Sequence, residues 1–312
     1  MLWSGLHMEN NMRYNQLNEY LKEKFGERAL KICVDGGFTC PNRDGTCGYG
    51  GCIYCSEKGS GELINYGKSI SEQVKEYFNS YRSKRANKFI VYFQNFTNTY
   101  DTVENLKKKY DSALIDDRII GLSIGTRPDC INEEIAKLIS SYSDKYYVCV
   151  ELGLQTSDNE IGKIINRGYT SEQFTEAVKI LNKYNIGVVA HIMVGLPNET
   201  KDTIMSTVDF INKHELQGVK IHCTYVVENT VLADMYRAGK YKALELDDYI
   251  ETLIDIMTHL NPNFVIHRIS GDAPKDILVA PMWNVHKMWI LHGFEKRFEG
   301  RNLKQGMYYK EN

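Results

Sequence analysis

Four of the eight cysteines in this 312-residue chain lie close together, at positions 40, 47, 52 and 55. Cys52 and Cys55 are separated by two residues, so their thiolates can reach one metal centre from a single turn, with a third ligand from Cys40 or Cys47. The surrounding segment, CPNRDGTCGYGGCIYC, is rich in glycine, which favours turns over helix or strand. Two centres fit this loop. One is a closed zinc site made by all four thiolates, and the other is a [4Fe–4S] cluster held by three, whose fourth iron stays open to a small molecule.

The rest of the composition indicates that these thiols are reduced. The chain has no run of eighteen apolar residues, and its first residues, MLWSGLHMENNMRYNQ, lack the pattern of a signal peptide. We therefore expect a cytoplasmic protein without membrane contact, in which cysteines serve metal or redox chemistry rather than disulfides. The formal net charge of -2 gives no overall attraction to nucleic acid, so a polyanionic partner has to meet a local basic patch.

The cysteine loop needs a scaffold, and the chain predicts an α/β one. Apolar, β-branched runs alternate with amphipathic helical patterns from about residue 29 onward. Capping-box pairs at Ser69 with Glu72 and at Thr170 with Gln173 predict the starts of two helices. Strands that are apolar throughout are typical of a parallel sheet covered by helices, either open or curled into a full or partial barrel. The expected strands are 29–34, 88–93, 118–125, 146–153, 186–195 and 218–226, with a weaker seventh at 263–269.

Most of the unusual residues follow these strands. In a βα fold the C-terminal strand ends meet at one edge, and the active site lies there. The segments at this edge are the cysteine loop, QNFTNTY, TRPDC, QTS, GLPNET, TYVVENT and SGDAP, in chain order. The sequence therefore predicts one site to which many strands contribute.

The cysteine loop resembles the cluster loop of radical S-adenosylmethionine (SAM) enzymes. GFTCPNRDGT followed by GGCIYC, with later blocks such as GLSIGTRPDC, NRGYT and GDAPKDILVAPMW, resembles the YhcC/YtqA-like family over nearly the whole chain. In that family the cluster ligands follow C-x11-C-x2-C, which implies Cys40, Cys52 and Cys55 and leaves Cys47 outside the motif. The resemblance implies a [4Fe–4S] cluster and SAM as cofactors. It also implies an α/β fold, namely a partial (β/α)6-type TIM barrel at residues 28–260, preceded by an N-terminal helical segment at 1–27 and closed by a C-terminal helical extension at 261–312.

The resemblance further implies where SAM binds. The chain is similar, more distantly, to the radical SAM subunit of Elongator and to the oxygen-independent coproporphyrinogen III dehydrogenase, which carry glutamate where this chain has Gly125. Arg167 is expected to bind the SAM carboxylate as a fork, the TNT segment to bind its amino group, and Tyr54 to pack beside the ligand of the open iron. The implied SAM contacts are Tyr54, Thr97, Asn98, Thr99, Gln155, Arg167 and His191. Taken one at a time, each also has an ordinary structural role, such as an ion pair or a core hydrogen bond.

Members of the resembled family are implied to modify the wobble uridine of tRNA, converting 5-carboxymethylaminomethyluridine to 5-aminomethyluridine. Arg268 or His267 would bind the carboxylate of that substrate. The candidate catalytic and substrate residues are His191, His222, Tyr225, His267 and Arg268. The expected partners are tRNA, for which the basic residues after Val285 offer a surface, and an electron donor such as flavodoxin or ferredoxin.

Two other functions stay open on the sequence. One is a radical SAM enzyme that acts on a small metabolite or a peptide. The other is a binding protein stabilised by zinc and without redox activity. Metal analysis separates the zinc protein from the enzymes, and loss of a modified tRNA nucleoside separates the two enzymes.

Overall fold

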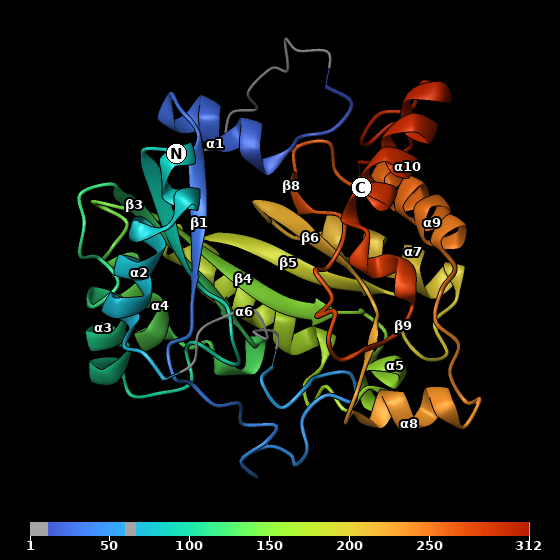
Figure 1. The fold of residues 1–312 in the computed structure, drawn as a ribbon, viewed down its shortest axis with the longest axis horizontal. Helices are drawn as coiled ribbons and strands as arrows, with labels where there is room; N and C mark the ends of the chain where they lie inside the picture. Colours follow the sequence, from blue (N-terminus) through green and yellow to red (C-terminus); the bar gives the residue numbers. More distant parts are fainter. Residues whose placement is uncertain (1–11, 60–66, 312) are drawn as a thin grey trace.

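The computed structural model describes residues 12–59 and 67–311, and Figure 1 shows them as one curled sheet with helices around it. Seven strands of this part pair in parallel in the order β1-β2-β3-β4-β5-β6-β8, so the predicted α/β partial barrel is confirmed. The strands are β1 (Ala29–Val34), β2 (Lys88–Phe93), β3 (Ile119–Thr126), β4 (Tyr147–Gln155), β5 (Gly187–Val194), β6 (Gly218–Cys223) and β8 (Val265–Arg268). Residues 1–11 of the predicted N-terminal segment lie outside the described residues.

Helices follow most of the strands and cover the outer face of the sheet (Figure 1). The capping boxes predicted at Ser69 and Thr170 are both present, so local sequence fixes these two helix starts. No helix in the described ranges is long and apolar enough to cross a bilayer. The α-helices of the described part are α1 (Leu17–Phe25), α2 (Ile70–Asn79), α3 (Val103–Asp111), α4 (Glu133–Ser140), α5 (Asn159–Ile164), α6 (Ser171–Lys183), α7 (Lys201–Asn212), α8 (Val231–Arg237), α9 (Leu246–His259) and α10 (Lys287–Gly300).

Strands β1 and β8 are the two edges of the sheet, which curls without closing. Helix α1 contacts both edge strands, and Gln16, just before it, forms a parallel bridge with Ile266 of β8. The weaker seventh strand of the sequence analysis is β8, and it pairs with β6 in the main sheet. The expected division between the barrel and the C-terminal extension, at residue 261, therefore falls between β6 and β8 of one sheet. Two short strands, β7 (Val226–Val227) after β6 and β9 (Leu278–Ala280) after β8, form a separate antiparallel pair.

The layer between the sheet and its helices is apolar. Phe89 and Phe93 of β2 and Leu122 of β3 are fully buried, and the ring of Phe93 meets the ring of Tyr110 edge-on with centroids 5.3 Å apart. Strands buried on both faces explain why the sequence shows continuous apolar runs rather than alternation.

The concave side of the sheet contains a buried charge network. Glu151 on β4 accepts hydrogen bonds from Lys220 Nζ at 2.7 Å and Ser123 Oγ at 2.8 Å, shares one of 2.8 Å with His191 Nε2, and pairs with Lys31. Burial by itself raises the pKa of Glu151, but the two ammonium groups outweigh burial and hold that pKa well below its ordinary value. A buried carboxylate is stable only with such partners. The network joins side chains from β1, β3, β4, β5 and β6.

A glycine allows β6 and β8 to approach closely beside this network. Gly218 of β6 pairs with Val265 of β8, and a Cβ on Gly218 would lie 2.2 Å from Val265 O. A side chain fits there only if the backbone moves. Val219 pairs with Ile266 next, and after a register shift Lys220 pairs with Arg268, so the same ladder places two cations on neighbouring strands.

We expect Gly218→Ala to lower the free energy of unfolding by about 1–3 kcal/mol, because the added methyl group pushes β6 away from β8. Thermal and urea unfolding followed by circular dichroism measure this change. Gly300→Ala is the matched control, because a Cβ there meets nothing within 4 Å, and it should leave stability unchanged or raise it. A Gly218→Ala variant as stable as the wild type contradicts the packing described.

Glu151→Gln should lower the free energy of unfolding at neutral pH by about 3–5 kcal/mol, because two buried ammonium groups lose their counter-charge. The pKa of Glu151 is depressed in the folded state, so its stabilising effect is present above the ordinary carboxylate pKa and is lost as the pH falls. The difference between wild type and variant should therefore shrink in acid, as unfolding curves across pH will show.

Glu176→Gln is the control for this experiment. It removes a carboxylate from an exposed pair with Lys179 and should change stability by less than about 0.5 kcal/mol. If the two variants lose stability equally, the buried network does not hold the barrel interior together.

Candidate active site at the cysteine loop

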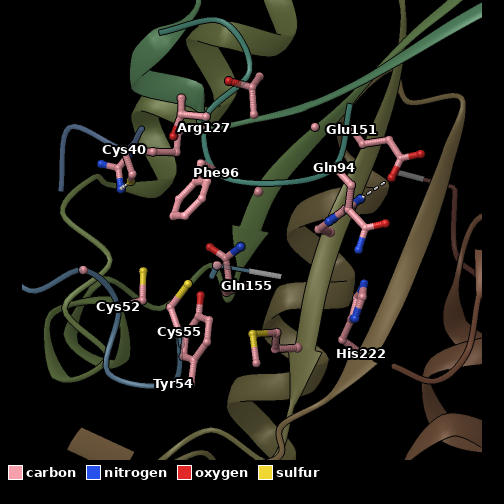
Figure 2. Close-up of a pocket in the computed structure, with 18 of the residues that line it drawn as sticks. Cys40, Cys52, Tyr54, Cys55, Gln94, Phe96, Arg127, Glu151, Gln155 and His222 are labelled. Carbon is pink, nitrogen blue, oxygen red and sulfur yellow. Dashed lines mark hydrogen bonds and ion pairs between the residues drawn. The ribbon is translucent and has the colours of Figure 1, made fainter. Parts of the chain in front are cut away.

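A pocket of about 230 Å³ lies at the C-terminal edge of the strands (Figure 2). The cysteine loop borders one end of it, and side chains from β4, β5, β6 and β8 border the other. The loops after β2 and β3 contribute Phe96, Thr97 and Arg127 between these ends. The pocket therefore draws on many strands at the edge where the sequence placed the site.

Three cysteines border the first end. Cys40, Cys52 and Cys55 line the pocket with free thiols, and Figure 2 shows the sulfur atoms of Cys52 and Cys55 beside the ring of Tyr54. Cys47 is exposed and is not among the described residues that line the pocket. The geometry thus groups the same three cysteines that the C-x11-C-x2-C motif contains.

The cysteine loop is fastened to the segment that follows β4. Asn42 Nδ2 donates to Asn166 O at 2.6 Å, and Asn166 Nδ2 donates back to Gly51 O at 2.7 Å. The amide of Ile53 donates to Ile165 O at 3.1 Å. Asn166 has a left-handed backbone with φ of 51°, a conformation that asparagine tolerates better than most residues. These cross-links hold in place a loop that is too rich in glycine to form regular structure.

The donor set fits an iron–sulfur cluster. Burial raises the pKa of Cys52, and burial together with the charge of Cys52 raises the pKa of Cys55 to about 12, so these thiols need a bound metal charge to become thiolates. Cys40, Cys52 and Cys55 border one end of the pocket, so a cluster held by these three thiolates would leave an open coordination position towards the cavity. In residues 12–59 and 67–311, no three His, Cys, Asp or Glu side chains are already arranged around a single metal ion.

Four residues expected to contact SAM line the pocket, namely Tyr54, Thr97, Gln155 and His191. Thr97 Oγ1 is buried and has no hydrogen-bond partner within the described part of the chain, so a polar group of a ligand can satisfy it. Gln155 has a left-handed backbone with φ of 60°, and its Oε1 accepts from Tyr169 OH at 2.6 Å. A non-glycine residue in this conformation, fixed by a buried tyrosine, is typical of a preorganised binding site.

The other three residues expected to contact SAM, Asn98, Thr99 and Arg167, are not among the described residues that line the pocket. Arg167 is fully buried, and its guanidinium donates to Leu154 O at 2.6 Å, to Tyr169 O at 2.9 Å and to Asn159 Oδ1 at 3.1 Å. These hydrogen bonds tie Arg167 to the segment after β4.

Asn98 and Thr99 likewise support the loop after β2. Asn98 Nδ2 donates to Gly125 O at 2.7 Å, and the hydroxyl of Thr99 lies 2.6 Å from that of Thr126. Of the TNT segment, Thr97 is therefore the residue that faces the ligand space.

The expected substrate residues divide in the same way. His222, Tyr225 and Arg268 line the end of the pocket opposite the cysteines, together with His191. His267 is not among the described residues that line the pocket, and its side chain is buried inside the barrel with 1% exposed. Burial and the nearby lysine lower the pKa of His191 to about 4, and burial with the Arg268 charge holds the pKa of His222 well below its ordinary value. Both imidazoles are therefore neutral at pH 7.

A carboxylate lies one strand away from the position where the more distant relatives carry glutamate. Gly125 of β3 pairs with Glu151 of β4, and Glu151 lines the pocket. A Cβ on Gly125 would lie 3.1 Å from Phe93 O, so the space beside β2 is tight. In this chain the acidic group at this level of the barrel comes from β4.

Sequence reasoning did not single out the charged residues of the barrel interior. Lys31, Glu151 and Lys220 each interrupt an apolar strand, and that interruption was the available signal, because a charge in a strand buried on both faces requires a partner or a ligand. Arg127 was also missed, although its guanidinium lies 3.8 Å from Cys40 Sγ. The available signal for Arg127 was its position two residues after the predicted strand 118–125.

Two family matches cover most of the chain. Residues 42–211 match the Radical SAM superfamily, and residues 216–300 match the Radical_SAM C-terminal domain. The superfamily uses a [4Fe–4S] cluster and SAM, so the predicted cofactors are confirmed at the level of the family.

Individual relatives agree with this assignment. The chain is 38% identical over 300 residues to the uncharacterized protein YtqA of Bacillus subtilis. This aligned region covers 96% of this chain and 93% of that protein. The chain is 33% identical over 191 residues to the tRNA uridine(34) acetyltransferase of Dehalococcoides mccartyi, and this shorter aligned region covers 60% of this chain and 40% of that protein. The structure of Methanocaldococcus infernus Elp3 shares the fold with a TM-score of 0.67 at 20% identity, covering 89% of this chain and 64% of that one. The chain belongs to the radical SAM superfamily and, within it, to the YhcC/YtqA-like family.

Proposed function

We propose that this radical SAM enzyme acts on the wobble uridine of tRNA and converts 5-carboxymethylaminomethyluridine to 5-aminomethyluridine. The observation that carries the proposal is one pocket with three cysteines at one end and polar, cationic side chains at the other. Similarity to a protein named tRNA uridine(34) acetyltransferase supports a tRNA uridine as the substrate class.

The residues of this chain position the reactants. When bound, the cluster and SAM supply a 5′-deoxyadenosyl radical that abstracts a hydrogen atom. Thr97 and Gln155 bind polar groups of SAM, and Tyr54 packs beside it at the cysteine end. The methylene between the amine and the carboxylate of the substrate is the expected site of abstraction, because both neighbours stabilise the resulting radical. Loss of one electron from this radical to a one-electron carrier, and of one proton to solvent, would give an imine, which water would hydrolyse to the amine of 5-aminomethyluridine and glyoxylate. Holding this methylene towards SAM and away from water is the contribution of the pocket walls.

The histidines at the other end suit a polar but uncharged contact. His191 and His222 have rings 5.5 Å apart and depressed pKa values, so at neutral pH each accepts or donates a hydrogen bond without adding charge. With Tyr225 they form the wall against which the uridine substituent lies.

The basic C-terminal stretch is partly neutralised within the protein. Arg297 of α10 and Arg301, the residue just after that helix, both pair with Glu251, and Lys287 pairs with Asp272. Helix α10 therefore offers less positive charge to RNA phosphates than its sequence indicates, and specific recognition falls to the pocket.

Anaerobic reconstitution with iron and sulfide should give about four irons per chain and, under reduction, cleavage of SAM to 5′-deoxyadenosine. A double variant with Cys52→Ala and Cys55→Ala should lose both properties, because it lacks two of the three cluster ligands. Cys47→Ala is the matched control and should keep both, since Cys47 lies outside the pocket lining. Iron analysis, absorption spectra and chromatography of SAM products give the readouts. One tightly bound zinc without SAM cleavage contradicts the proposal and favours the zinc-stabilised binding protein.

Deletion of the gene should deplete 5-aminomethyluridine in cellular tRNA and cause 5-carboxymethylaminomethyluridine to accumulate, because the enzyme that removes the carboxymethyl group is gone. Mass spectrometry of tRNA nucleosides measures both. The Cys47→Ala protein should restore the pattern, and the double cysteine variant should not. Unchanged nucleosides in a strain whose purified enzyme cleaves SAM would rule out this substrate and point to a metabolite or a peptide.

A further inference from the structure

The end of the pocket opposite the cysteines holds more positive than negative charge. Lys220 of β6 and Arg268 of β8 both line it, and they are pairing partners across the two strands. Of the described residues that line the pocket, Glu151 is the one carboxylate. Figure 2 shows Glu151 and His222 on the side of the cavity away from Cys52 and Cys55.

The carboxylate of Glu151 does not neutralise all of the positive charge at this end of the pocket. It is shared between Lys220, whose Nζ lies at 2.7 Å, and Lys31, so one negative charge serves two ammonium groups. Lys220 also donates to Tyr92 OH at 3.0 Å. Its side chain is 9% exposed, so water compensates little of the remaining charge.

Arg268 is also only partly compensated. Its guanidinium pairs with Asp272, which is 46% exposed and also pairs with Lys287 at 3.4 Å. Solvent weakens such a surface pair. Among the largely buried side chains, Lys31, Lys220 and Arg268 are 19%, 9% and 20% exposed and face the single buried carboxylate of Glu151, so an excess of positive charge remains beside the pocket.

A polar atom at the same place has no partner. His222 lies two residues after Lys220 on β6, so both side chains leave the same face of the strand. His222 lines the pocket, and its Nε2 is buried without a hydrogen-bond partner among the described residues. The SGDAP segment packs over it, since a Cβ on Gly271 would lie 3.5 Å from His222 Nδ1. A buried imidazole nitrogen left open beside two cations indicates a missing ligand.

We propose that Lys220, Arg268 and His222 form a subsite for the carboxylate of the substrate. The inference rests on the proposed function, because 5-carboxymethylaminomethyluridine carries a carboxylate one bond from the methylene to be attacked. SAM has a carboxylate too, but the cluster holds SAM at the cysteine end. An arginine fork beside an ammonium is the arrangement that recognises a carboxylate, and His222 Nε2 supplies a further polar contact.

This subsite does two things for the reaction. It directs the methylene next to the carboxylate from the cationic end towards the cysteine end of the pocket, where SAM binds. It also selects against uridines whose substituent has no carboxylate, because these would leave the excess positive charge at this end of the pocket uncompensated.

Lys220 makes the subsite sensitive to pH. Burial lowers its pKa to about 8, although Glu151 partly offsets this. Its ammonium form is therefore present below about pH 8 and is lost above it, so affinity for a carboxylate should fall as the pH rises through this range. The charged and titratable groups that face it are Cys33 and Lys31 on β1, Tyr92 on β2, Glu151 on β4, His191 on β5, His222 on β6, and His267 and Arg268 on β8.

The test compares two anticodon stem-loop RNAs bound to the reconstituted enzyme. One carries 5-carboxymethylaminomethyluridine at the wobble position, and the other carries the corresponding carboxamide. The two RNAs have the same phosphates and nearly the same shape, but the carboxamide lacks the negative charge of the carboxylate. The carboxylate RNA should bind about ten- to a hundredfold more tightly at pH 7, as expected for hydrogen bonds to charged groups. The preference should fall as the pH rises above 8. Fluorescence anisotropy gives the dissociation constants without turnover.

Variants assign the preference to the subsite. Arg268→Gln and Lys220→Met should each reduce the ratio of the two dissociation constants towards one. Arg268→Gln leaves the Glu151 network intact and so remains informative if Lys220→Met fails to fold. Lys179→Met, on the exposed face of α6, is the matched control and should keep the wild-type ratio.

Four outcomes decide the matter. A carboxylate preference that both variants reduce supports the subsite. Equal binding of the two RNAs by the wild type, with the carboxylate RNA still converted, overturns the subsite and leaves the proposed function standing. Failure of the wild type to bind or convert either RNA overturns the proposed function and the subsite with it. A preference that survives in both folded variants places the carboxylate elsewhere.

Discussion

The interior of this barrel depends on one buried carboxylate. Glu151 accepts hydrogen bonds or ion pairs from side chains on four other strands, and its depressed pKa keeps it charged throughout the physiological range. Apolar packing drives the outer layer, where helices cover the sheet, but the concave side has to remain polar to serve a reaction. A single negative charge among several cations allows that side to be buried and polar at once.

The same network gives the pocket its two different ends. At one end Cys52 and Cys55 are neutral thiols until a metal centre binds, because burial raises their pKa. At the other end burial, together with the nearby cations, lowers the pKa of His191 and His222 and keeps them neutral, and the excess of cations leaves attraction for an anion. A cofactor bound at the first end and a carboxylate at the second would place a methylene between them. Strands β6 and β8 approach closely at Gly218, and beyond a register shift the same ladder pairs Lys220 with Arg268.

Much of the fold could be predicted because its signals are local. Apolar runs marked the strands of the main sheet, and the capping boxes at Ser69 and Thr170 gave two helix starts. Spacing alone marked Cys52 and Cys55 and left Cys40 and Cys47 as alternatives for the third ligand, and the resemblance implied Cys40, which lines the pocket with the other two. The place of β8 was harder to define, because pairing with β6 over a distance of more than forty residues is not a local property.

The site was predicted less completely, for two physical reasons. A motif match indicates that a residue matters without showing what it contacts, and Arg167 proved to donate to backbone oxygens instead of facing the pocket. The network of Lys31, Glu151 and Lys220 was missed because its members come from three strands and meet only when the sheet curls. A charge in the middle of an apolar strand is the feature that could have revealed it.

The most direct test of the account follows one hydrogen atom. tRNA whose 5-carboxymethylaminomethyluridine carries deuterium at the methylene next to the carboxylate is incubated with reconstituted, reduced enzyme and SAM, and the nucleosides and 5′-deoxyadenosine are analysed by mass spectrometry. The account predicts that 5-aminomethyluridine and deuterated 5′-deoxyadenosine appear together. SAM cleavage that yields unlabelled 5′-deoxyadenosine and leaves the uridine unchanged would contradict it.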